Sequence, residues 1–135
     1  MKYLLDTNAC IQYLTLRSGA LAARLQATSP REIALCSVVK SELTYGAHKS
    51  ARKQKNLETL SKFFEPLASL PFDDNAAVIA GEVRAALERL GTPVGPNDLL
   101  IASIALANGL VLVTHNTAEF GFVPGLTTED WEEIP

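Results

Sequence analysis

Four acidic side chains stand at points of the sequence where a carboxylate could bind a cation: Asp6, Glu42, Asp98 and Glu119. Taken singly, each has an ordinary structural explanation as a turn residue, a helix cap, a solvated helix face or a loop acid. Four carboxylates gathered in one place would repel one another and raise their pKa values unless a cation neutralised them. The set therefore predicts a metal site, provided that the fold brings the four together.

The type of ligand predicts the type of metal. Carboxylate oxygens suit the hard ions Mg²⁺ and Mn²⁺, which keep several waters and also bind phosphate oxygens. A zinc site is not expected, because only His48 and His115 are available and Cys10 and Cys36 have no ligand spacing. Both cysteines stand among apolar neighbours, so we expect buried free thiols rather than a disulfide.

The elements that must position these acids alternate between apolar strands and helices. Strand-like runs are expected at Tyr3–Leu5, 33–36, 67–72 and 110–113, and helical patterns at 7–27 (interrupted at 18–19), 37–49 with Ser37 as its cap, 52–64, 73–90 and 99–107. The run 110–113 is apolar on both faces, which is typical of a parallel sheet covered by helices. The sequence thus predicts a three-layer α/β/α sandwich with a mostly parallel sheet, in one domain spanning 1–135.

This architecture places the acids at one edge. Ligands of such sheets bind beyond the carboxyl ends of the strands. Asp6 follows the first strand, Glu42 lies in the helix after the second, Asp98 starts the buried helix, and Glu119 follows the last long strand. We therefore expect all four at the carboxyl edge.

Charge alone is a weak guide to the ligand. The 135 residues carry 12 basic and 15 acidic side chains, a net charge of −3, whereas nucleic-acid-binding domains are usually basic. However, eight of the acids belong to the candidate site or to the tail 129–133. A basic run remains, formed by His48, Lys49, Arg52, Lys53 and Lys55. It is either a solvated helix junction or a track for a phosphate backbone.

Other classes of protein are disfavoured. The apolar run before Asp6 is shorter than the roughly 7 to 15 residues of a signal peptide, and 99–113 is shorter than the roughly 20 that cross a bilayer. We therefore expect a cytoplasmic protein. No glycine-rich phosphate loop occurs, so a nucleotide cofactor is not supported. A phosphotransferase with Asp6 as nucleophile would need an acid at position 8, where Asn8 stands.

The same residues carry a resemblance to a known family. The carriers are Leu5-Asp6-Thr7-Asn8, Ser41-Glu42-Leu43 with Gly46, Pro96 to Ala102, Val113 to Asn116 with Glu119-Phe120, and the tail segments 123–126 and 129–131. With these motifs in order over the whole length, the chain resembles the PIN-domain ribonucleases and, among them, the VapC toxins of bacterial toxin–antitoxin pairs.

The resemblance implies roles for individual residues. The metal-binding acids of the family fall on Asp6, Glu42 and Asp98, and its more variable fourth acid on Glu119. Supporting or phosphate-contacting groups fall on Thr7, Asn8, Asn97, Thr114 and Asn116. The family usually has an acid or Asn where Asn116 stands, so either Asn116 or Glu119 completes the site.

The resemblance also implies a function and partners. It indicates a Mg²⁺- or Mn²⁺-dependent endoribonuclease, the toxin of a type II pair, that leaves a 5′-phosphate; details of the tail and of the Asp98 motif point to the anticodon loop of initiator tRNA. It further implies a VapB-like antitoxin whose C-terminal segment covers the acidic site, and a homodimer. Candidates for those contacts, or for the core, are Tyr13, Tyr45, Phe63 and Phe64. The alternative is a non-catalytic RNA- or protein-binding module of the same fold.

Overall fold

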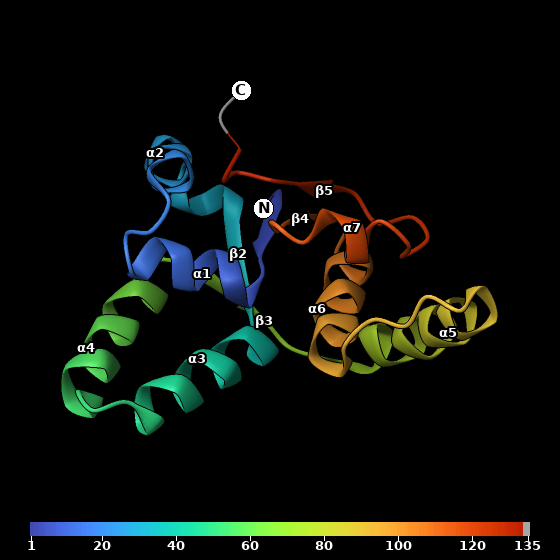
Figure 1. Cartoon of the computed structure of the whole chain (residues 1–135), viewed down its shortest axis with the longest axis horizontal. Coiled ribbons are helices and arrows are strands. Elements are labelled where there is room, and N and C mark those ends of the chain that lie inside the picture. The colour runs from blue at the N-terminus through green and yellow to red at the C-terminus, as the bar shows by residue number, and fades with distance from the viewer. Residues whose placement is uncertain (134–135) are drawn as a thin grey trace.

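The computed structural model describes residues 1–133 and forms five strands and seven α-helices within that range (Figure 1). The strands are β1 (Tyr3–Leu5), β2 (Ile33–Cys36), β3 (Ala68–Leu70), β4 (Val111–Val113) and β5 (Thr128–Glu129). The helices are α1 (Thr7–Leu14), α2 (Gly19–Ala27), α3 (Ser37–Lys49), α4 (Lys53–Phe64), α5 (Asp74–Leu90), α6 (Pro96–Ala107) and α7 (Thr117–Phe120), with a 3₁₀ turn at Pro30–Glu32.

The strands form one parallel sheet in the order β3-β2-β1-β4-β5. The chain moves from β1 outward to β3, then crosses back to β4 and β5 on the other side of β1. Because parallel crossovers are right-handed, this reversal places α1 to α4 on one face and α5 and α6 on the other. Figure 1 shows the two helix groups on opposite sides of the sheet. The predicted three-layer α/β/α sandwich is confirmed.

Burial explains why such short strands are stable. Every residue of β1 and β2 is buried, and so is most of β4, so their apolar side chains join the helices of both outer layers in one core. Cys10 and Cys36 lie in this core as free thiols, as predicted. Within the described part of the chain, no helix is long and apolar enough to cross a membrane.

Two local expectations are corrected by the structure. Ser37 is the first helical residue of α3 rather than its cap, because β2 runs directly into α3 and Cys36 occupies the cap position without a side-chain hydrogen bond. The edge strand β3 covers only Ala68–Leu70 of the expected 67–72. By contrast, Asp6 caps α1 through a 2.8 Å bond from the Ala9 amide.

The sheet gains a fifth strand that the sequence pattern does not reveal. β5 pairs with β4 and brings the tail back over the sheet. Trp131 is buried edge-on against the Tyr3 ring, with centroids 4.9 Å apart, and the Arg24 guanidinium lies 4.8 Å from the Trp131 ring. Arg24 also pairs with Glu129 at 3.2 Å. These contacts fix the tail against β1 and α2.

Candidate active site

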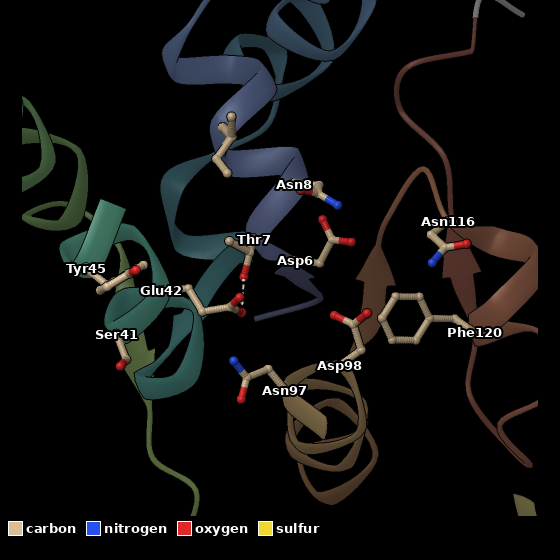
Figure 2. Close-up of a pocket in the computed structure, with 11 residues that line it drawn as sticks. Asp6, Thr7, Asn8, Ser41, Glu42, Tyr45, Asn97, Asp98, Asn116 and Phe120 are labelled. Carbon is tan, nitrogen blue, oxygen red and sulfur yellow. Dashed lines mark hydrogen bonds between the residues drawn. The ribbon is translucent and has the colours of Figure 1, made fainter. Parts of the chain in front are cut away.

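The strand order reverses at β1, and the crevice that forms at such a point is the usual binding site of an open parallel sheet. A cavity of about 620 Å³ lies there (Figure 2). Its lining consists of Asp6, Thr7, Asn8, Ile11, Ser41, Glu42, Tyr45, Asn97, Asp98, Asn116 and Phe120. Three of the four predicted acids therefore face one cavity, although they are up to 92 positions apart in the sequence.

Asp6 is the most buried of these acids, with 3% of its surface exposed. It follows β1 directly, and the Ala9 amide holds one of its carboxylate oxygens. Burial raises the pKa of Asp6, and the charges of Glu132 and Glu42 raise it further, whereas hydrogen bonds from Thr114 and Ala9 lower it. A carboxylate so placed gains stability from a nearby cation.

Glu42 reaches the cavity from α3, the helix that follows β2. The Thr7 hydroxyl donates a 2.7 Å hydrogen bond to Glu42 Oε1. Since Thr7 is the first residue of α1, this bond joins the segments that follow β1 and β2. The half-buried Glu42 is therefore oriented toward Asp6 rather than left on a solvated helix face, as Figure 2 shows.

Asp98 completes the group from the first turn of α6. Its pKa is raised to about 6, first by burial and then by the charges of Glu119, Asp6 and Glu42. All of these causes favour the protonated form of Asp98 in the absence of a cation. The other three predicted acids therefore lie close enough to Asp98 to oppose its ionisation.

The structure distinguishes the positions of Asn116 and Glu119. Asn116 lines the cavity, whereas Glu119 is absent from its lining. Glu119 accepts a 3.0 Å bond from the Gly95 amide and a 2.6 Å bond from the Asn116 side chain. Glu119 thus fixes the loop before Asp98 and orients Asn116, while its charge still acts on Asp98.

The remaining predicted residues divide into two groups. Thr7, Asn8 and Asn97 line the cavity. The buried Thr114 does not line it, and its hydroxyl oxygen accepts a 3.0 Å hydrogen bond from the backbone amide of Asn116. Lys49, Arg52, Lys53 and Lys55 are exposed at the α3–α4 junction and do not line the cavity. Lys49 is seven residues beyond Glu42, about 10 Å along the helix axis, so the basic run starts beside the site.

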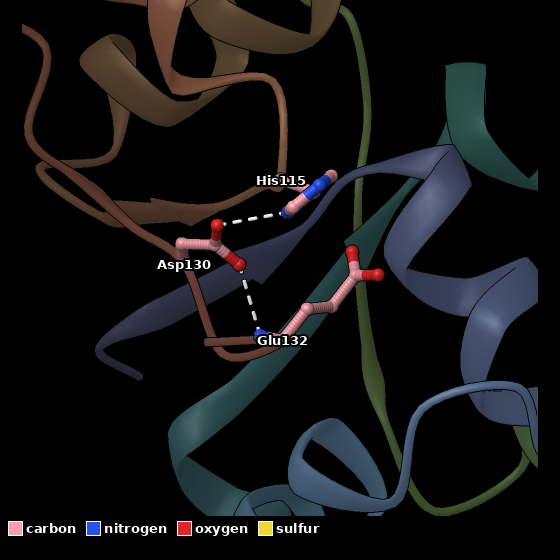
Figure 3. Close-up of side chains that lie close together, drawn as sticks. All are labelled: His115, Asp130 and Glu132. Carbon is pink, nitrogen blue, oxygen red and sulfur yellow. Dashed lines mark hydrogen bonds and ion pairs between the residues drawn. The ribbon is translucent and has the colours of Figure 1, made fainter. Parts of the chain in front are cut away.

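One feature near the site has no counterpart in the sequence pattern. His115, Asp130 and Glu132 bring their ligand atoms within 4.8 Å of one another (Figure 3). His115 Nδ1 lies 2.8 Å from one Asp130 oxygen, and the Glu132 amide donates to the other at 2.9 Å. Both Asp130 oxygens are thus engaged, so the cluster ties the tail to the end of β4. The signal available in the sequence was only an acidic tail.

The contact between His115 and Asp130 makes a testable prediction. The pKa of the exposed His115 is raised, chiefly by the hydrogen bond and charge of Asp130. In Asp130→Asn the pKa of His115 should fall toward the ordinary value of about 6.5, because the imidazolium loses its anionic partner. An NMR titration of the two imidazole rings measures this, with the His48 signals as the internal control. An unchanged His115 titration would mean that the tail does not lie beside it.

Several known proteins are similar to this chain. A family model described as the PIN domain matches residues 3–123. The chain is 40% identical to the tRNA(fMet)-specific endonuclease VapC of Salmonella typhimurium over 131 residues, covering 97% of this chain and 98% of that one. It is 37% identical to ribonuclease VapC2 of Rickettsia felis over 134 residues, covering 98% and 100%.

Solved structures agree with these sequence relatives. The DNA-bound VapBC structure from Salmonella typhimurium superposes with a TM-score of 0.91 at 40% identity, covering 97% of this chain and 98% of that one. VapBC2 from Rickettsia felis, bound to a promoter DNA fragment, gives a TM-score of 0.88 at 37% identity, covering 97% and 99%. The similarity thus extends over nearly the whole chain.

Proposed function

This chain belongs to the PIN-domain family, in its VapC branch of toxin ribonucleases, and we propose that it hydrolyses RNA with a divalent metal held by Asp6, Glu42 and Asp98, with Glu119 in support. The observation that carries the proposal is the convergence of Asp6, Glu42 and Asp98 on one cavity, with Glu119 close enough to help raise the pKa of Asp98. The complete acid set disfavours the alternative of a non-catalytic module.

The donor set fits Mg²⁺ or Mn²⁺. Asp6, Glu42 and Asp98 would hold the ion from the cavity wall, and Glu119 would support them from behind through Asn116. The oxygens are all hard ligands, and neither histidine lines the cavity. Bound by these acids, a divalent ion would lower the pKa of a water molecule and stabilise the oxygen that leaves phosphorus.

The protein groups around the acids provide binding and orientation. Asn8, Asn97 and Asn116 present amide groups on the cavity wall, where they can donate hydrogen bonds to phosphate oxygens. Thr7 fixes Glu42, and Ala9 fixes Asp6, so two acids are held before the substrate arrives. Attack by water on phosphorus, with the 3′-oxygen as the leaving group, gives one end with a 5′-phosphate and one with a 3′-hydroxyl, whereas attack by the RNA 2′-hydroxyl would give a 2′,3′-cyclic phosphate.

The substrate we propose is initiator tRNA, cut in the anticodon loop. The Salmonella typhimurium relative, 40% identical to this chain, is named a tRNA(fMet)-specific endonuclease. The exposed basic run at the α3–α4 junction would contact the phosphate backbone of the same RNA.

We propose that the partner is a VapB-like antitoxin whose C-terminal segment covers the acidic cavity. The similar structures from Salmonella typhimurium and Rickettsia felis are VapBC complexes. A toxin homodimer remains part of the proposal. Of the aromatic candidates for these contacts, Tyr13 and Phe63 pack with ring centroids 5.7 Å apart and planes tilted by 32°, and they line a separate cavity of about 290 Å³ with Leu25 and Pro66.

One experiment tests the proposed activity directly. The purified protein, freed of antitoxin, is incubated with total RNA and Mg²⁺, and the new ends are mapped by sequencing. We expect cuts at one RNA position with 5′-phosphate ends, absent when EDTA is present. Cleavage that persists in EDTA, or ends carrying a 2′,3′-cyclic phosphate, would contradict the mechanism.

Crowding of the acids also predicts how stability depends on pH and metal. Between about pH 4 and 6 the folded state keeps a proton on Asp98 that the unfolded state has released, so stability falls as pH rises through this range. The loss from this half-exposed group is on the order of 1 kcal/mol after solvent screening, and Asp6 acts in the same direction.

Metal should reverse this loss at neutral pH. A ligand at 100 times its dissociation constant adds about 2.7 kcal/mol to the free energy of unfolding. Thermal melts at pH 5 and pH 7, with EDTA or with millimolar Mn²⁺, measure both effects. A melting temperature at pH 7 that does not respond to Mn²⁺ would count against a metal site here.

A further inference from the structure

Tyr45 is a large aromatic side chain that the core does not use. It lies on α3 with 65% of its surface exposed, yet it lines the acidic cavity. Tyr13 and Phe63, two other aromatic candidates, are partly buried and pack against the core. The Tyr45 ring is therefore free of the core and available at the cavity.

Its position follows from helix geometry. Residues three or four apart share a helix face, so Tyr45 stands beside Glu42 and Ser41. In the view of Figure 2, Glu42 lies between the Tyr45 ring and Asp98. A phosphate at the acids would therefore have a neighbouring nucleotide close to the ring.

A basic side chain lies beside the Tyr45 ring. Lys49 Nζ lies 5.8 Å from the Tyr45 ring centroid, within the range of a cation–π contact, and Lys49 is itself exposed. An exposed aromatic ring next to a basic side chain is the combination with which proteins bind single-stranded nucleic acid, the ring stacking on a base and the cation binding the backbone.

We propose that Tyr45 is the platform on which a nucleobase beside the scissile phosphate stacks. This inference rests on the proposed function, since it names a substrate contact of the same site. The surroundings favour a base over an apolar protein side chain, because Ser41 and Glu42, which share the helix face of Tyr45, are polar, and so is Asn97 in the same cavity lining. An apolar partner would bury these groups without hydrogen bonds, which is unfavourable.

The test separates binding from cleavage. RNA affinity is measured by fluorescence anisotropy in the Asp98→Asn background, using the anticodon stem-loop of initiator tRNA or, if wild type does not cut it, the RNA identified by end mapping. Tyr45→Phe keeps the ring and should bind within about twofold of its parent. Tyr45→Leu should bind about tenfold more weakly. Phe122→Ala removes another exposed aromatic, 52% exposed and outside the cavity lining, and should have no effect.

A second measurement identifies the stacked base. RNAs lacking one base at each position near the cut should include one that weakens binding about tenfold to the Tyr45 protein and has no further effect in Tyr45→Leu. With Asp98 restored, Tyr45→Leu should raise the half-saturating RNA concentration while leaving the single-turnover rate at saturation within about twofold.

The two proposals fail in different ways. If wild type cuts no RNA, the proposed function is wrong. If wild type cuts RNA but Tyr45→Leu binds as tightly as Tyr45→Phe, the stacking contact is wrong and the ring belongs to a protein contact instead.

Discussion

Asp98→Asn should abolish RNA cleavage, lowering the single-turnover rate by about three orders of magnitude or more, while the protein stays folded. The substitution removes one carboxylate charge at nearly constant volume, and the stabilisation lost with a metal ligand amounts to several kcal/mol. Asp6→Asn should have the same effect on cleavage. Rates are measured with excess enzyme and Mg²⁺, and folding by thermal melts.

The thermal melts should also show how the substitution changes the stability of the metal-free protein. Because Glu119, Asp6 and Glu42 repel the Asp98 carboxylate, the metal-free Asp98→Asn protein should be at least as stable as wild type at pH 7. Its stabilisation by Mn²⁺ should be weaker. If Asp98 acts in catalysis rather than in folding, Asp98→Asn should therefore lose activity without losing stability.

A matched control is available on α5. Asp74, like Asp98, lies in the first turn of its helix, but it is exposed and outside the cavity lining. Asp74→Asn should cleave RNA at the wild-type rate. If Asp98→Asn also cleaves at that rate, the assigned site is wrong.

The site was predictable because its acids follow recognisable elements. Apolar strands and helix starts can be located from local patterns, and a parallel sheet collects the ends of its strands at one edge. Asp6 and Asp98 were placed by this rule alone. The sequence left Glu42 open between the site and a solvated helix face, and its place in the cavity lining and its bond from Thr7, 35 positions away, show that it faces inward.

What the sequence could not supply depends on long-range pairing. β5 consists of two residues, too short for any periodic signal, yet it brings Asp130 and Glu132 to the edge near His115 and Asp6. The different positions of Asn116 and Glu119 depend in part on the Gly95 amide, which donates a hydrogen bond to one Glu119 oxygen. No local pattern encodes either contact.

The basic run at the α3–α4 junction leads to the other large expected effect. Replacing Lys49, Arg52, Lys53 and Lys55 with Gln, with the acids untouched, should weaken RNA binding by about 10- to 100-fold near 0.1 M salt. The loss should be similar for all RNAs, since phosphate contacts carry no sequence information. Cleavage at saturating RNA should stay near the wild-type rate, because none of the four side chains lines the cavity.

The salt dependence distinguishes this effect from loss of fold. Each phosphate contact on a single strand contributes a slope of about −0.7 to log K against log salt, so losing four should make the slope shallower by up to about 3. Arg84→Gln with Arg89→Gln provides a control: both lie on α5, in the opposite helix layer, and Arg84 already pairs with Glu88 at 3.1 Å. If the quadruple variant keeps the wild-type slope, the basic run is a solvated face and does not bind RNA. If the α5 control has a shallower slope than wild type, α5 contacts the RNA backbone.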